Sequence, residues 1–154
     1  MSCKTDINYG YGFAVGASDE NLKEFLSKHR EALLDPRIVK GKELLEYLDN
    51  TRNFNPKEDF FDWECYNNGM EGFLGVIADI MTVETGIRFS YEPAQEEAGS
   101  EDYIMLVQVM PWYYNDTERN LTEDDLKAIC SKYIAELCSY GERIPGYVEQ
   151  EYFG

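Results

Sequence analysis

Carboxylates are the residues of this sequence whose types and spacing could do chemistry. Glu58, Asp59 and Asp62 are three or four residues apart, so on a helix they share one face and repel one another. Paired carboxylates can act as general acid and base in glycoside hydrolysis. The chain has 30 acidic residues, however, so pairs at this spacing also arise by chance and do not by themselves predict an enzyme.

The acidic residues are unevenly distributed along the chain. Residues 1–57 hold 9 acidic and 9 basic residues, whereas residues 58–102 hold 12 acidic residues and one basic residue, Arg88. The formal net charge of the 154-residue chain is −16, and residues 58–102 supply −11 of it. Such a charge repels phosphate and anionic lipid, so we expect no direct binding to nucleic acid or membranes. It attracts a partner with a basic protein surface.

Aromatic residues accompany the acidic ones. Trp63 lies in the acidic segment 56–65, and Trp112 and Tyr113 follow the third predicted strand. Trp and Tyr are favoured at protein interfaces. We therefore predict a partner-binding surface that combines acidic residues with aromatic residues at its edge: Glu58, Asp59, Asp62, Trp63, Glu64, Glu92, Glu96, Glu97, Glu101, Asp102, Trp112 and Tyr113.

Other residue types give no sign of catalysis or of metal binding. His29 is the only histidine and falls on the apolar stripe of a predicted helix, so we expect it to pack at the rim of the core. The 4 cysteines lack C-x-x-C spacing and are expected to be reduced thiols. The stretch 10–13 (Gly-Tyr-Gly-Phe) resembles the signature of RNA-recognition motifs, but it lies on the first strand rather than the third. We assign no catalytic residue, metal site or cofactor.

The hydrophobic pattern predicts a single α+β domain over residues 1–154. Strict alternation of apolar residues from Ile7 to Val15 is typical of a strand. Ser18 is expected to cap the helix that follows, which ends at Asp35 and Pro36, and Thr122 and Asp125 form a capping pattern for the last helix. Further helices are predicted at 42–48, 56–65 and 70–85, and further strands at 87–92, 103–110 and 147–153.

The order of these elements predicts the topology. It matches the split βαβ arrangement of ferredoxin-like folds, with an antiparallel sheet, helices on one face and extra helices in the first crossover. The strands 87–92 and 103–110 are expected to pair as a hairpin. No apolar stretch is long enough to span a bilayer, and no leader-like pattern opens the chain, so a cytoplasmic protein is expected.

The C-terminal third resembles small uncharacterised proteins of phages and prophages of Gram-positive bacteria. The resemblance is carried by Pro111-Trp112, Asn115-Asp116, residues 121–126 (Leu-Thr-Glu-Asp-Asp-Leu) and Lys132-Tyr133. Small acidic proteins of this kind are similar in character to anti-CRISPR inhibitors, several of which mimic nucleic acid. The resemblance implies an anti-defence inhibitor.

Together these observations favour an acidic, non-enzymatic binding protein that occupies the basic groove of a nuclease or of another nucleic-acid-binding protein. Carboxylates one helical turn apart can occupy basic pockets made for phosphates. One alternative is a small-molecule-binding or enzymatic ferredoxin-like domain with a pocket between the glycine side of the first strand and the helix 70–85. Another is a phage or bacterial protein whose acidity serves only solubility.

Overall fold

The computed structural model describes residues 5–16, 21–38, 41–50, 73–93, 101–138 and 143–153. The predicted helix 56–65 and the predicted cap Ser18 lie outside these residues. The described part of the chain combines helices with one antiparallel sheet, as the sequence predicts for an α+β domain.

Four strands form the sheet, in the order β2-β3-β1-β4. All neighbouring strands are antiparallel, which confirms the predicted hairpin and the predicted C-terminal strand. The third strand ends at Val107, whereas the sequence pattern predicts an end at Met110; a 3-10 turn follows at Pro111. The strands are β1 (Thr5–Val15), β2 (Phe89–Glu92), β3 (Asp102–Val107) and β4 (Gly146–Phe153).

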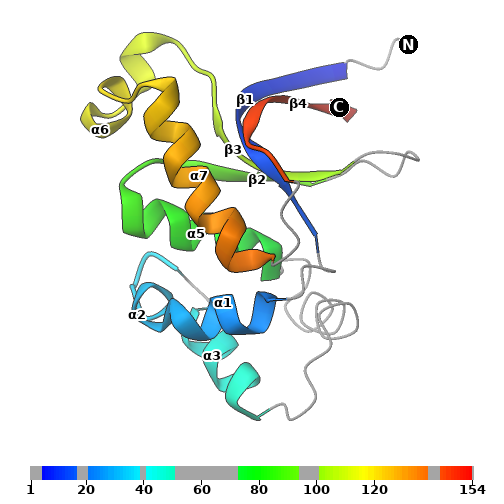
Figure 1. Ribbon diagram of the computed structural model, residues 1–154, viewed down its shortest axis with the longest axis vertical. Helices are drawn as coiled ribbons and strands as arrows, with labels where there is room; N and C mark the ends of the chain where they lie inside the picture. Colours follow the sequence, from blue (N-terminus) through cyan, green and yellow to red (C-terminus); the bar gives the residue numbers. More distant parts are fainter. Residues whose placement is uncertain are drawn as a thin grey trace.

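The helices lie on one side of the sheet in two layers (Figure 1). In the first layer, α5 (Phe73–Thr85) packs on β2 and α7 (Glu123–Leu137) packs on β1. In the second layer, α1 contacts α7 and α2 contacts α5. The remaining elements are α1 (Leu22–Lys28), α2 (Arg30–Leu33), α3 (Gly41–Asn50), the 3-10 turn η1 (Pro111–Tyr113) and α6 (Asp116–Arg119).

Among the described helices, none combines the length and the apolar character needed to cross a membrane.

The core lies between the sheet and the two helix layers. Phe13 of β1, Leu74 and Ile77 of α5 and Leu137 of α7 are almost completely buried, as the hydrophobic pattern predicts. α5 ends at Thr85, and the following Gly86 adopts φ of +75°, a conformation that glycine tolerates because it has no side chain. The predicted capping box at Thr122 and Asp125 is present at the start of α7.

The first predicted helix is interrupted. Sequence periodicity predicts one helix through Leu33, but the structure contains α1 and α2 with His29 between them, at φ −100° and ψ 34°. Both ring nitrogens of His29 contact carboxylates, Glu84 of α5 and Glu136 of α7. These contacts come from helices distant in the sequence, so the local pattern does not reveal the break.

The glycine side of β1 faces away from the helices. Because side chains alternate along a strand, Gly10 and Gly12 lie on the face opposite the buried Tyr11 and Phe13. A Cβ atom at Gly12 would lie 1.8 Å from the carbonyl oxygen of Ile104 on β3, so β1 and β3 approach closely there. The pocket predicted between this glycine side and α5 is therefore wrong, because the glycines do not face α5.

Candidate partner-binding site

Seven of the predicted partner-binding residues lie outside the described part of the chain, so their placement stays a prediction: Glu58, Asp59, Asp62, Trp63, Glu64, Glu96 and Glu97. The other five are described, and they fall into two groups. Three acids lie at the hairpin end of β2 and β3, namely Glu92, Glu101 and Asp102, and the other group is Trp112 and Tyr113 in η1.

The three hairpin acids do not form an exposed acidic patch. Glu92 is only 7% exposed, and its carboxylate accepts hydrogen bonds from Asn8 (3.3 Å) and Ser90 (3.2 Å). Burial raises the pKa of Glu92, and those two hydrogen bonds offset part of the increase. Asp102 is half-buried and accepts a hydrogen bond from the hydroxyl of Tyr91 at 2.8 Å. Of the three, only Glu101 is exposed, so the prediction that Glu92 belongs to an exposed surface is wrong.

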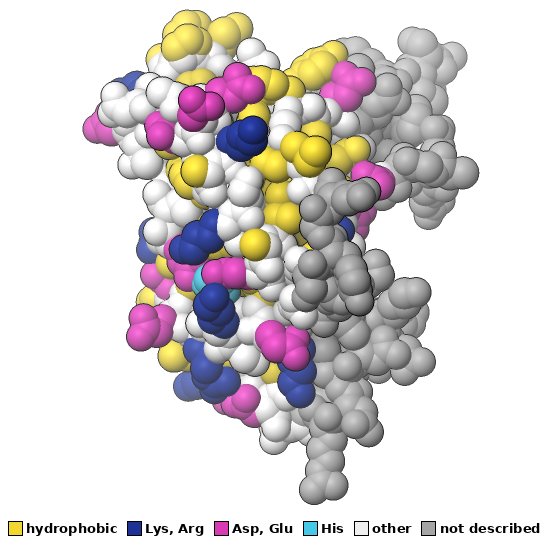
Figure 2. All heavy atoms as spheres, in the orientation of Figure 1, with side chains coloured by type: hydrophobic (Ala, Val, Ile, Leu, Met, Phe, Trp, Pro, Cys, Tyr) yellow, Lys and Arg dark blue, Asp and Glu magenta, His cyan; other side chains and the backbone are white. Residues whose placement is uncertain are grey.

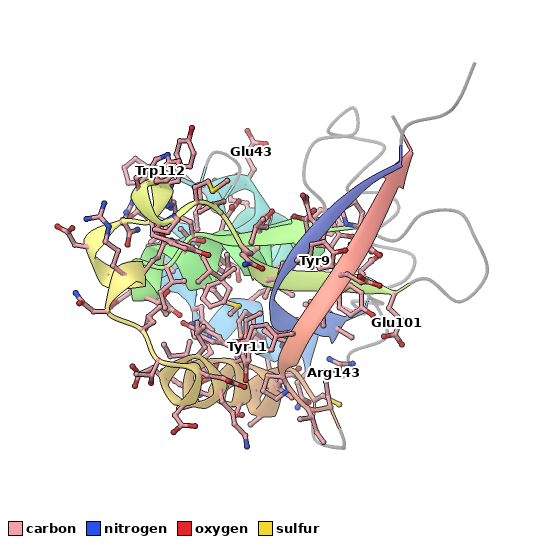
Figure 3. All side chains as sticks on the ribbon, turned by 90° about the horizontal axis from the view of Figure 1, so that it is seen from above. Tyr9, Tyr11, Glu43, Glu101, Trp112 and Arg143 are labelled. Atoms are coloured by element: carbon pink, nitrogen blue, oxygen red, sulfur yellow. The ribbon has the colours of Figure 1, made fainter. Side chains whose placement is uncertain are left out.

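The two groups are also far apart. Trp112 and Glu101 lie on opposite sides of the molecule (Figure 3). β3 separates them, because Asp102 begins this strand and η1 follows its other end. An extended strand rises about 3.3 Å per residue, so its six residues hold the groups roughly 20 Å apart. The described acids of the hairpin and the aromatic residues of η1 therefore form two separate groups.

The strongest candidate surface is the aromatic platform, which we define as Met110, Trp112 and Tyr113. These side chains are 57%, 68% and 63% exposed. The rings of Trp112 and Tyr113 lie 6.0 Å apart at an angle of 46°. Hydrophobic side chains gather at the end of the molecule that carries η1 and α6, with acidic side chains close by (Figure 2). Exposed large apolar side chains that lie together are characteristic of protein interaction sites.

An ion pair between the exposed Arg88 and the buried Glu118 holds the platform in place. The guanidinium of Arg88 donates to the carboxylate of Glu118 at 2.6 Å and also to the backbone carbonyl of Tyr113. The side chain of Glu118 is completely buried, and the backbone N–H of Asn115 donates to it at 2.9 Å. Burial alone would raise the pKa of Glu118, but the hydrogen bonds from Arg88 and Asn115 outweigh it and hold this pKa below its ordinary value.

The platform borders a groove of about 770 Å³, which we call the aromatic groove. One wall comes from residues of β1, β3 and β4, and the other from η1, α6 and the start of α7. Tyr11 and Tyr147 meet edge to face at 5.1 Å within it. The lining is largely aromatic and aliphatic: Gly10, Tyr11, Leu106, Gln108, Pro111, Trp112, Tyr114, Glu118, Arg119, Leu121, Leu126 and Tyr147.

The charges around the groove are mainly negative. Burial raises the pKa of Tyr11, and electrostatic interactions with Cys130, Glu123, Tyr147 and Asp124 raise it further. Glu123 and Asp124 are both exposed in the first turn of α7.

Two basic residues near the groove have acidic partners. Arg119 lines the groove and pairs with Asp116 at 2.9 Å, and Arg88 pairs with Glu118. Elsewhere on the face drawn in Figure 2, acidic side chains lie among the basic ones around α1 to α3. The described surface is therefore not one continuous acidic face.

His29 does not form a catalytic arrangement with the residues that contact it. It is 7% exposed, which confirms the predicted packing on the core, and its ring lies 4.4 Å from that of Phe25. Each ring nitrogen lies 2.6 Å from a carboxylate, Glu84 on one side and Glu136 on the other. Through these two contacts, the ring of His29 joins the break between α1 and α2 to α5 and α7.

The sequence analysis missed Arg88, Glu118 and Tyr147 as parts of the site. A local signal existed for Glu118, because Asn115 and Glu118 have the spacing of a capping box, and the structure contains that box at the start of α6. No local signal links Arg88 to Glu118, which is 30 residues away. Comparison of the chain with protein-family models, curated proteins and solved structures finds no match.

Proposed function

We propose that this protein is a non-enzymatic binding protein that docks onto the basic surface of a nucleic-acid-binding protein and blocks it. The observation that carries the proposal is the aromatic platform. Trp112 and Tyr113 are well exposed, yet the Arg88–Glu118 pair fixes the backbone beneath them. Because the platform is already ordered, little conformational entropy is lost when a partner covers it.

The charge of the chain supports the choice of partner. A formal net charge of −16 attracts basic proteins from a distance and speeds their encounter with this one. We place the proposed contact at the aromatic platform rather than at the hairpin acids. Exposed carboxylates accompany it on α6 and α7, the helices that line the groove, namely Asp116, Glu123 and Asp124.

Displacement by DNA tests this proposal. The protein is immobilised, bacterial lysate is applied at low ionic strength, and bound proteins are eluted either with a salt gradient or with random-sequence duplex DNA. We expect the same basic proteins in both eluates, because the chain and DNA would compete for one groove. Recovery of salt-sensitive proteins that DNA does not displace would contradict mimicry of nucleic acid.

Two variants locate the contact. Trp112→Ala removes the centre of the platform, whereas Leu34→Ala removes another well-exposed apolar side chain, at the end of α2. We expect Trp112→Ala to lose most of the DNA-displaceable proteins and Leu34→Ala to retain them. Equal retention by both variants would show that the platform is not the contact surface.

The finer proposal names the target as a nuclease of bacterial defence, and its support is the resemblance of residues 111–133 to phage and prophage proteins. We also propose a ferredoxin-like assignment for the fold. Its support is the strand order β2-β3-β1-β4, in which α5 precedes β2 and α7 connects β3 to β4.

A further inference from the structure

The aromatic rings of the groove suit a cationic ligand. The walls of the groove present four aromatic rings, from Tyr11, Trp112, Tyr114 and Tyr147. Trp112 and Tyr147 are 68% and 73% exposed, so ligands can reach them from solvent. The face of an aromatic ring carries negative potential and attracts cations such as the ammonium of lysine or the guanidinium of arginine.

The fixed charges of the groove favour a cation in the same place. Arg119 and Glu118, the two charged residues of the lining, are each paired, with Asp116 and Arg88 respectively. Glu123 and Asp124 lie in the exposed first turn of α7, in the sequence between Leu121 and Leu126 of the lining, and no ion pair holds either of them among the residues that the structure describes. Two uncompensated carboxylates at the α7 side of this groove repel phosphate and attract ammonium or guanidinium groups.

The size of the groove indicates how much of a ligand it accepts. A volume of about 770 Å³ lies in the upper part of the range of small-ligand sites and exceeds the volume of one side chain. The groove is open to solvent along the exposed rings of Trp112 and Tyr147. An extended peptide segment with one basic side chain inserted fits such a site better than a small cation alone.

We propose that the aromatic groove binds a lysine or arginine side chain of the partner, presented on an extended segment, by stacking on Trp112 and pairing with Glu123 and Asp124. The inference rests on the proposed function, because it assigns the point at which that basic partner is held. Arginine suits the site especially well, since its planar guanidinium both stacks on aromatic rings and pairs with carboxylates.

Peptide binding tests the inference directly. The probes are a capped hexa-arginine peptide and a capped hexa-citrulline peptide, which has nearly the same shape without the charge. Binding is followed by the fluorescence of Trp112 in a Trp63→Phe background, because the chain contains only 2 tryptophans. We expect hexa-arginine to change the emission saturably and hexa-citrulline to bind at least about tenfold more weakly.

Matched charge variants distinguish binding at the groove from general electrostatic attraction to this acidic protein. Glu123→Gln with Asp124→Asn removes two charges at the groove, whereas Glu31→Gln with Glu46→Gln removes two exposed charges on α2 and α3. We expect the first pair to weaken hexa-arginine roughly five- to tenfold and the second pair less than twofold. Far-UV circular dichroism checks that both variants keep their helices.

Three outcomes would overturn the inference. Equal losses in the two double variants would mean that net charge alone attracts the peptide. Tight binding of hexa-citrulline would mean that the groove takes neutral ligands, and an unchanged Trp112 signal would mean that the peptide binds elsewhere.

The proposed function can fail independently of the groove assignment. If lysate yields no DNA-displaceable protein while hexa-arginine still binds, the groove assignment stands and the inhibitor role does not. If the double variant Glu123→Gln with Asp124→Asn captures DNA-displaceable proteins as well as the unmodified protein does, only the groove assignment fails.

Discussion

Arg88 connects the start of β2 to the platform by pairing with Glu118, a carboxylate with no exposed surface, while also donating to the backbone of Tyr113. The Nη2 atom of Arg88 lies 2.6 Å from Oε1 of Glu118, and its Nε lies 3.1 Å from Oε2. The backbone N–H groups of Arg88 and Asn115 also donate to this carboxylate. A single buried charge therefore organises the turn that exposes Trp112.

Arg88→Met should destabilise the protein by about 2 to 3 kcal/mol. The variant leaves Glu118 buried without its cation, although two backbone donors remain. Urea unfolding measures the loss, and Arg119→Met is the control. Arg119 pairs with Asp116, whose side chain is 96% exposed, so this variant should cost less than about 0.5 kcal/mol. Equal effects of the two substitutions would contradict the role assigned to Glu118.

Much of the fold was predictable because its signals are local. The alternation from Ile7 to Val15 and the box of Thr122 and Asp125 depend only on neighbouring residues, and both are confirmed. The burial of Glu92 was not predictable, because it depends on how the sheet brings Asn8 close to it across 84 residues.

The candidate site was predictable only in part. Trp112 was identified by residue type, and the structure places it on an exposed surface. Its separation from Glu101 follows from the direction of β3, which composition does not encode. The groove also depends on Tyr147, which β4 brings beside Tyr11 from the other end of the chain.

His29→Phe should destabilise the protein by about 2 to 3 kcal/mol. Phenylalanine keeps an apolar ring against Phe25 but donates no hydrogen bond to Glu84 or Glu136. The matched control is Lys28→Met, which removes the other partner of Glu136. The side chain of Lys28 is 65% exposed, so this loss should stay below about 0.5 kcal/mol.

His29→Phe should also change how the free energy of unfolding depends on pH. Burial alone would raise the pKa of Glu136, but hydrogen bonds from His29 and Lys28 outweigh it and hold this pKa below its ordinary value. The stability gained in this way is present above the pKa of the unfolded glutamate, about 4.3, and is lost as the pH falls through the lowered folded pKa. Urea titrations from pH 6 to pH 3 should therefore show a shallower loss in His29→Phe than in the unmodified protein. An unchanged slope would mean that His29 does not stabilise the ionised form of Glu136.

Gly12→Ala should destabilise the protein by more than about 3 kcal/mol, because the new Cβ would lie 1.8 Å from the carbonyl oxygen of Ile104 and 2.6 Å from Cα of Met105. Both obstacles are backbone atoms, so no side-chain rotation relieves them. Gly146 lies opposite Gly12 on β4, and no atom of the described residues lies within 4 Å of the position that its Cβ would take. Gly146→Ala should therefore stay within about 0.5 kcal/mol of the unmodified protein. Thermal unfolding, or the yield of folded protein where Gly12→Ala does not fold, compares the two.

Glu92→Gln should stabilise the protein at pH 7 by an amount on the order of 1 kcal/mol. Burial raises the pKa of Glu92, so the folded chain holds its proton more tightly than the unfolded chain does. The carboxylate therefore costs stability as the pH rises from about 4.3 through the raised pKa. Glutamine removes that charge, and its amide oxygen can still accept the hydrogen bonds from Asn8 and Ser90.

The stabilisation produced by Glu92→Gln should increase as the pH rises. The gain over the unmodified protein should be largest at pH 7 and should shrink towards zero as the pH falls well below about 4.3, where Glu92 is protonated in both states. Glu101→Gln, at an exposed position, should show no such trend. A loss of stability at pH 7 would mean that the charge of Glu92 is compensated in the folded protein, and it would then have to be reassigned as one half of an ion pair.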